Sequence, residues 1–281
     1  MHGQDEFKGT MMKGYIFAIL LVLVAGCSSR DLTIEEVVDR LNVYKQQSTR
    51  EAVDSANRLL ENAVKKHPNN MTLIMELIRV NLLKGDWNKM EEYVDRGVRI
   101  SGDNDELMFY RLKIFYGREE YEKFIANYKN NIRKIQSPHI KANIYHLAAG
   151  VYGAMGDARE EEKCFLEALK YYKLAGEDNV IIQNDIGAFY ANQGNAEKAK
   201  QYFANSLTIN ANNYLVVNNL GRIFYSEGDY ERALDFFNKS LLLNPNQPQL
   251  QEALEKLKKE LDNNKNDAVT GGPDLGVEQK Q

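Results

Sequence analysis

The stretch from Tyr214 to Gln247 constrains the fold of this chain more than any other. Its 34 residues contain two runs of apolar residues at the three- and four-residue spacing of an amphipathic helix, separated by Gly228 and Asp229. Pro245 ends the second run, because proline cannot continue a helix. We therefore predict two helices joined by a tight turn. A helical hairpin of this size cannot bury its apolar face alone, so it is expected to stack on further copies.

Copies of the unit recur upstream at separations of 34 to 38 residues, with starts at Val180, Ala142, Asp105, Met71 and Val37. The last unit places small, aromatic, glycine and proline residues at fixed positions: Gly221, Phe224, Gly228, Ala233, Phe237, Ser240 and Pro245. This arrangement resembles the tetratricopeptide repeat (TPR) family. The resemblance implies an all-α fold, a right-handed TPR superhelix (α-α solenoid) of about six helical hairpins plus a C-terminal capping helix.

The amino-terminal region has the features of a secretory signal. Lys13 precedes an apolar run from Tyr15 to Ala25, which is too short to span a bilayer comfortably. The segment from Val24 to Cys27 resembles the bacterial lipobox. That resemblance implies cleavage before Cys27, a lipid on its sulfur and an acyl chain such as palmitate on the new amino terminus; an ordinary signal peptide is the alternative. Ser28, by the same resemblance, favours the periplasmic face of the outer membrane, or the outer face of the cytoplasmic membrane in a Gram-positive cell.

These features divide the chain into four parts: a signal peptide (1–26, of which 1–10 is expected to be a misassigned start), a lipidated tether (27–32), a TPR solenoid (33–262) and a disordered tail (263–281). Within the solenoid we predict repeats at about 37–70, 71–104, 105–138, 142–175, 180–213 and 214–247, and a capping helix at 249–261. A capping box of Thr33 and Glu36 is expected to begin the first helix.

The third and fourth units depart most from the family pattern. Glu119 replaces the glycine of the turn in the third unit, and Glu161 replaces an alanine in the fourth. Cys164 lies on an apolar stretch, and no second cysteine is left for an internal disulfide once Cys27 is lipidated. We expect Cys164 to be a small packed residue, with a redox role as the alternative.

The sequence offers no sign of catalysis. No zincin, nucleophile-elbow or P-loop motif occurs, and the four histidines have no Cys, His or Asp cluster around them, so neither a catalytic residue, a metal site nor a cofactor is predicted. The net charge of −4 argues against nucleic acid as the main ligand. The prediction is a protein that is not an enzyme.

What remains is a binding surface. The TPR resemblance implies that the first helix of each unit lines a groove, with these side chains facing it: Phe109, Lys113, Tyr116, Asn184, Asp185, Asn192, Asn218, Asn219, Arg222 and Tyr225. Asparagine amides can bond the backbone of an extended peptide, Arg222 can pair with a carboxylate, and the aromatic residues can form a wall. Asparagine at these positions is also common in the family without a ligand. The family's chaperone-type carboxylate clamp is not reproduced.

We therefore expect a lipid-anchored scaffold of the bacterial cell envelope that binds a peptide or protein segment and aids assembly or stability of an envelope complex. The plan of a lipobox followed by TPR units is loosely similar to type IV pilus pilotins, and also to TPR lipoproteins of β-barrel assembly and to protease adaptors. The alternatives are a small-molecule or glycan-binding protein, and a purely structural homo-oligomer joined through the third unit.

Overall fold

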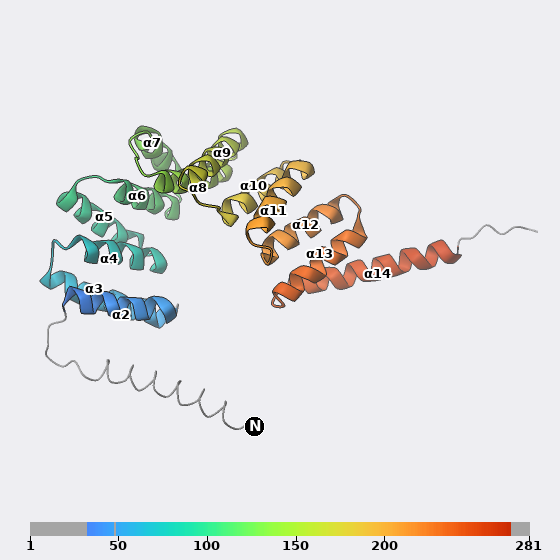
Figure 1. Ribbon diagram of the computed structural model, residues 1–281, viewed down its shortest axis with the longest axis horizontal. Coiled ribbons are helices and arrows are strands. Elements are labelled where there is room, and N and C mark those ends of the chain that lie inside the picture. Colours follow the sequence, from blue (N-terminus) through green and yellow to red (C-terminus); the bar gives the residue numbers. More distant parts are fainter. Residues whose placement is uncertain (1–32, 48, 271–281) are drawn as a thin grey trace, which may run out of the picture. The chain divides into compact units, whose positions relative to one another are not determined.

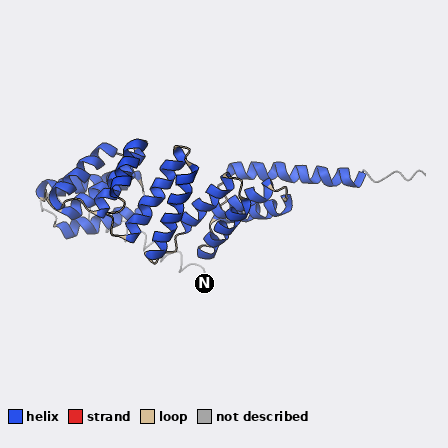
Figure 2. Cartoon of the chain, turned by 90° about the horizontal axis from the view of Figure 1, so that it is seen from above, coloured by secondary structure: helices blue, strands red, loops and turns tan. Residues whose placement is uncertain are grey.

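The computed structural model describes residues 33–47 and 49–270 of the chain. The predicted signal peptide, the lipidation of Cys27 and the tether lie outside the described residues, as do residues 271–281. Every regular element of the described part is a helix, and no strand occurs there (Figure 2). The chain divides into two compact units between Gly102 and Asp103.

In the first unit, the described residues from 33 to 102 form four helices that follow one another in space: α2 (Ile34–Gln47), α3 (Arg50–Lys66), α4 (Met71–Lys84) and α5 (Trp87–Ser101) (Figure 1). The predicted capping box begins α2: the Thr33 backbone N–H donates to Glu36 Oε2 at 2.8 Å, and the Glu36 N–H donates to Thr33 Oγ1 at 3.2 Å. Leu60 of α3 and Leu73 of α4 are fully buried between these helices.

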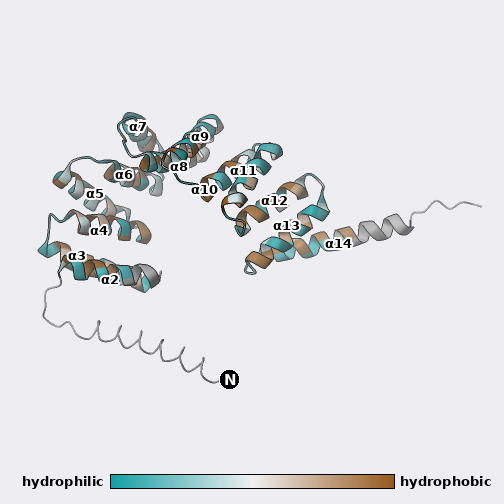
Figure 3. Ribbon diagram, viewed as in Figure 1, coloured by the Kyte–Doolittle hydropathy of each residue, from teal (hydrophilic) through white to brown (hydrophobic). Residues whose placement is uncertain are grey.

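The second unit contains the remaining helices of the described part: α6 (Asp105–Gly117), α7 (Tyr121–Asn131), α8 (Pro138–Ala154), α9 (Ala158–Leu174), α10 (Val180–Asn192), α11 (Ala196–Ile209), α12 (Tyr214–Ser226), α13 (Tyr230–Leu243) and α14 (Pro248–Thr270). They form successive antiparallel pairs, and each pair packs on the next. Helices such as α12 carry both apolar and polar residues along their length (Figure 3), as amphipathic packing requires. The all-α solenoid that the sequence predicts is confirmed.

Glycine and an aromatic ring lock the helices of the last two pairs together. A Cβ atom on Gly187 would lie 2.6 Å from the ring of Phe203, and one on Gly221 would lie 2.6 Å from the ring of Phe237. Both rings are buried, so they cannot move aside without opening the core. The small residue in the first helix of a pair is therefore required by the aromatic residue of the second.

Glu119 occupies the left-handed backbone conformation that glycine takes in the neighbouring turns. Its φ is 58°, against 77° at Gly156 and 73° at Gly194. The Glu119 N–H donates to the Tyr116 carbonyl at 3.0 Å, and the next N–H, that of Glu120, donates five residues back at 2.8 Å. This is the Schellman arrangement that ends a helix, and it normally favours glycine. The degenerate third unit thus keeps the turn geometry of the others.

The structure differs from the sequence prediction at the end of the solenoid. The capping helix was expected at 249–261, but α14 runs from Pro248 to Thr270, so residues 263–270 are helical rather than part of a disordered tail. No glycine or proline occurs between Pro248 and Gly271, so nothing in the local sequence stops the helix earlier. Leu250, Leu254 and Leu257 cover the last pair by packing against Ala233 and Phe237.

Candidate functional site

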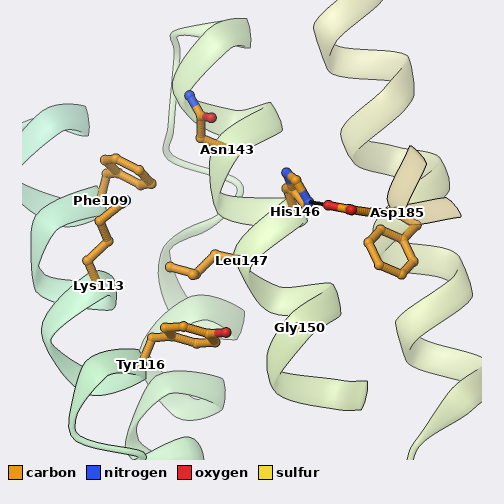
Figure 4. A pocket seen from close by; sticks show the side chains of 9 residues that line it. Phe109, Lys113, Tyr116, Asn143, His146, Leu147, Gly150 and Asp185 are labelled. Atoms are coloured by element: carbon orange, nitrogen blue, oxygen red, sulfur yellow. Dashed lines mark hydrogen bonds and ion pairs between the residues drawn. The ribbon is translucent and has the colours of Figure 1, made fainter. Parts of the chain in front are cut away.

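A pocket of about 300 Å³ lies between the first helices of three successive pairs in the second unit. We call it the α6–α8–α10 pocket. Its walls are Phe109, Lys113 and Tyr116 of α6, Asn143, His146, Leu147 and Gly150 of α8, Phe165 of α9 and Asp185 of α10 (Figure 4). Four residues of the sequence prediction, Phe109, Lys113, Tyr116 and Asp185, are therefore brought together in one place.

The α6 wall follows from helical spacing. Phe109, Lys113 and Tyr116 are four and three residues apart, so they share one face of α6. The other face carries Met108 and Leu112, which are buried in the core of the second unit. Because one face of α6 is buried in the core, the helix cannot rotate, and its opposite face holds these three side chains toward the pocket.

Asp105 ties the start of α6 to the segment that leads into α8. Its Oδ2 atom accepts hydrogen bonds from the backbone N–H groups of Gln136 and Ser137, at 2.8 and 2.7 Å. Ser137 in turn caps α8, accepting from the Ile140 N–H at 3.3 Å. The two helices that form most of the pocket are thus held in register at their amino-terminal ends.

Lys113 is a half-buried cation with no carboxylate partner among the described residues. Its Nζ atom lies 5.1 Å from the centroid of the Phe109 ring, within the range of a cation–π interaction. Burial lowers the pKa of Lys113 below the ordinary value of a lysine, because the charged form loses hydration. The pocket therefore holds a positive charge that no carboxylate of residues 33–47 and 49–270 neutralises.

Tyr116 lies over Gly150 at the other end of the α6 wall. A Cβ atom on Gly150 would lie 3.6 Å from both the hydroxyl oxygen and a ring carbon of Tyr116, which is ordinary contact. Tyr116 nevertheless remains 41% exposed, so its ring has one free side. The absence of a side chain at Gly150 leaves room for that ring against the α8 backbone.

A row of polar contacts continues from the pocket across the next two pairs. His146 Nε2 lies 2.8 Å from Asp185 Oδ2, as the dashed line in Figure 4 marks. Asn184 Nδ2 donates to Asp185 Oδ1 at 3.2 Å, and Asn219 Nδ2 donates to Asn184 Oδ1 at 3.2 Å. The Asp185 carboxylate is therefore already occupied. Asn184 and Asn219, which the sequence predicts as peptide-binding amides, bind each other and link α10 to α12.

Asn143 is fixed by a second network. Its Oδ1 atom accepts from the Tyr172 hydroxyl at 2.8 Å, and its Nδ2 atom lies 2.9 Å from His139 Nε2. His139 Nδ1 lies 2.6 Å from Glu177 Oε1. Burial and the neighbouring carboxylate of Glu177 raise the pKa of Tyr172 to about 12, so its hydroxyl remains a donor. The Asn143 amide consequently has one orientation in the pocket wall.

The sequence interpretation missed Asn143 and His146. With Ala142 as the first residue of the fourth unit, they occupy the second and fifth positions, which face the groove in the other units. Applying the same positional rule to this unit would have identified both. His146 instead drew attention only as a possible metal ligand, and the described residues contain no cluster of His, Cys, Asp and Glu that could hold a metal ion.

The other predicted residues lie elsewhere on the same side of the unit. Asn218 and Arg222 line a second pocket of about 610 Å³ with residues 246–250 and Ala253, and Asn218 Nδ2 lies 3.4 Å from Gln247 Oε1. The Tyr225 ring packs 5.4 Å from the ring of Tyr230. Asn192 is exposed at the last residue of α10. The structure thus distributes the predicted residues over two pockets and the surface between them.

Cys164 precedes the pocket residue Phe165 on α9 and is buried, as predicted for a packed residue. Its Sγ atom is 3.6 Å from the hydroxyl oxygen of Tyr128. Burial is the main reason that the pKa of the Cys164 thiol rises to about 11, so little thiolate forms at neutral pH. In the part of the chain from 33 to 270 that is described, no helix has both the length and the apolar character needed to cross a membrane.

Three solved structures share the fold. A chain of the APC/C hetero-tetramer Cut9-Hcn1 matches with a TM-score of 0.64 at 13% identity, over 89% of this chain and 46% of that one. YrrB, described as a TPR protein with an unusual peptide-binding site, matches with a TM-score of 0.50 at 11% identity, over 70% and 97%. PilW, described as a widely conserved type IV pilus biogenesis factor, matches with 0.63 at 13% identity, over 79% and 100%.

This chain therefore spans about half the length of the Cut9-Hcn1 chain and nearly all of the smaller two. At these identities the likeness concerns the fold alone. No curated protein sequence matches the chain. The geometry and the solved structures give the described part of the chain the fold of a TPR solenoid, and residues 190–257 also match the model of the family described as tetratricopeptide repeat.

Proposed function

We propose that this chain is a protein-interaction scaffold of the bacterial cell envelope, anchored by a lipid on Cys27. An extended segment of a partner protein would lie across the face that α6, α8, α10 and α12 form, which we call the inner face. The observation that carries this proposal is the α6–α8–α10 pocket, where polar and aromatic side chains from three helices converge around an unneutralised cation. Converging polar groups in an open cleft are typical of binding sites.

Two exposed apolar side chains support binding of a partner on the inner face. Ile181 of α10 is 63% exposed and Leu215 of α12 is 51% exposed. Each occupies the second position of its helix, one turn before the predicted inner-face residues Asp185 and Asn219. Covering the part of such a side chain that is still exposed stabilises a complex by about 1–2 kcal/mol. Two of them beside a polar pocket suit a segment with alternating polar and apolar contacts.

The anchor and location rest on the sequence. The lipobox-like residues before Cys27 support lipidation, and Ser28 supports the periplasmic face of the outer membrane. A tether of residues 27–32 would keep the solenoid close to that membrane. Together with the fold shared with PilW, which is described as a type IV pilus biogenesis factor, this supports a role in the assembly or stability of an envelope complex, by binding rather than catalysis.

Site-specific crosslinking tests the inner face. A photo-reactive amino acid at position 215 on α12 is expected to give one discrete adduct in intact cells. The matched control is position 242 on α13, where Leu242 is 83% exposed outside the inner face, and no equal adduct is expected there. Adducts of equal yield at both positions, or none at position 215, would refute binding on this face.

Fractionation tests the anchor separately. Replacing Cys27 by Ala is expected to abolish labelling by radioactive palmitate and to release the protein from the membrane fraction. In cells with two membranes, the unaltered protein should sediment with the outer membrane and resist protease until that membrane is opened. Membrane association that survives the Cys27→Ala change would rule out the lipid anchor while leaving the binding face untouched.

A further inference from the structure

Lys113 has the surroundings of a ligand-binding cation rather than of a surface lysine. Other lysines of the second unit, such as Lys163 and Lys200, pair with glutamates at 2.9 Å. Within the described part of the chain Lys113 has no such partner, and its partial burial removes hydration from the ammonium, which lowers its pKa. Leaving a desolvated cation unpaired costs stability, and a carboxylate is the group that restores both charge balance and hydrogen bonds.

The rest of the pocket suits the same ligand group. The one carboxylate in its wall, that of Asp185, is taken by His146 and Asn184, so it is not available to neutralise Lys113. The hydroxyl of Tyr116 has no hydrogen-bond partner among the described residues. A hydroxyl that can still donate, on the same helix face as an unpaired ammonium, favours an anionic group over a cationic one.

We propose that the α6–α8–α10 pocket receives an acidic side chain from within the partner segment, with its carboxylate on Lys113. This proposal rests on the proposed function, since it specifies the chemistry of the segment bound to the inner face.

The neighbouring surface argues for an acidic side chain inside a segment rather than for a chain terminus. Ile181 and Leu215 continue the inner face beyond the pocket, on α10 and α12, and call for apolar residues further along the same segment. Neighbouring helices lie on the order of 10 Å apart, and an extended chain advances about 3.4 Å per residue. Ile181 is two such helix steps from α6, which carries Lys113, and Leu215 is three, so the segment should carry apolar residues about six and about nine positions away from the acidic one.

Peptide binding to the full chain in mild detergent tests this chemistry. The probe is a fluorescent synthetic peptide with blocked termini, a serine background, one glutamate and leucines at those two spacings. We expect it to bind, and to bind about tenfold more tightly than the peptide with glutamine in place of glutamate. Lys113→Gln should remove this discrimination, and Lys113→Arg should retain most of it.

Lys141 provides the matched control. It is a lysine on α8 whose Nζ atom also lies over an aromatic ring, 5.2 Å from the centroid of Tyr171, but it does not line the pocket. Lys141→Gln should leave the discrimination intact. Circular dichroism of each variant establishes that its fold is retained.

The possible failures are distinct. Equal binding of the glutamate and glutamine peptides would overturn the acidic site while leaving inner-face binding in place. Tighter binding of a peptide whose only carboxylate is a free terminus would overturn the assignment to an internal side chain. No binding by any peptide would overturn the proposed segment chemistry, and crosslinking at position 215 would then decide whether the inner face binds a partner at all.

Discussion

Replacing Glu119 by glycine should stabilise the second unit. Glu119 has a φ of 58°, a conformation that costs an L-residue other than glycine about 1–2 kcal/mol. Its side chain is exposed and makes no hydrogen bond or ion pair within the described residues, so the change removes no contact. Glycine has more conformational freedom than glutamate in the unfolded chain, and this cancels about 0.5–1 kcal/mol of the stabilisation. The net expectation for Glu119→Gly is a free energy of unfolding higher by about 0.5–1 kcal/mol.

Gly194→Ala is the matched control, and it should change the free energy of unfolding in the opposite direction. Gly194 occupies the equivalent turn with a φ of 73°, and a Cβ atom there would meet nothing within 4 Å. Its N–H donates three residues back at 3.0 Å and the next donates five residues back at 2.8 Å, matching the turn at Glu119. Gly194→Ala therefore changes only backbone preference, and should lower the free energy of unfolding by a similar amount.

Denaturant unfolding followed by circular dichroism measures the free energy of unfolding of both variants. In a thermal scan, Glu119→Gly should raise the Tm by about 1–4 °C. Hydrogen exchange of the α6–α7 pair gives a local readout, with protection about two- to fivefold higher in Glu119→Gly. If both variants move stability in the same direction, or if Glu119→Gly lowers it, backbone strain at Glu119 is not the controlling effect.

Three further outcomes follow from the packing. Gly221→Ala should lower the free energy of unfolding by about 1–3 kcal/mol, because the new Cβ atom would lie 2.6 Å from the buried ring of Phe237. Gly150→Ala, whose Cβ atom would have its nearest contact at 3.6 Å, should be neutral or mildly stabilising in the same unfolding assay. In a Cys27→Ala background, Cys164 should resist a thiol reagent at pH 8 and react once the protein unfolds. A thiol pKa raised from 9.0 to about 11 lowers the thiolate fraction roughly 100-fold. Rapid reaction of the folded protein would contradict the burial of Cys164. Burial raises the pKa of Glu161 in the folded state, so the contribution of the protonated Glu161 side chain to stability is present at low pH and is lost as pH rises through that pKa. Glu161→Ala should therefore raise the free energy of unfolding more at pH 7 than at pH 4. A gain confined to pH 4 would contradict this expectation.

The architecture was predictable because its signals are local. The turn at Gly228 and the small residue at Gly221 lie within one 34-residue unit, and each acts on neighbours in that unit. Even Glu119, which breaks the pattern, keeps the same turn hydrogen bonds. The length of α14 was missed because a stretch poor in apolar residues was equated with disorder. A helix can continue through polar residues until a glycine or proline ends it.

The candidate site was predictable only in part. The positional rule selected Lys113 and Asp185 without showing that they line one pocket, and the same rule was not applied to Asn143 and His146. Nothing in the sequence indicated that Asn184 and Asn219 would use their amides on each other at 3.2 Å. Whether two side chains on successive first helices reach one another depends on how far apart and how rotated those helices are.

The sequence by itself determined the helices, their pairing and the turns, because apolar periodicity and turn chemistry act over a few residues along the chain. Only the tertiary structure decided which polar groups satisfy one another and which have no partner among the described residues. His146 and Asp185 are 39 residues apart and meet at 2.8 Å, which occupies one carboxylate and leaves the ammonium of Lys113 unpaired. That outcome depends on distances between helices, for which a single sequence has no local signature.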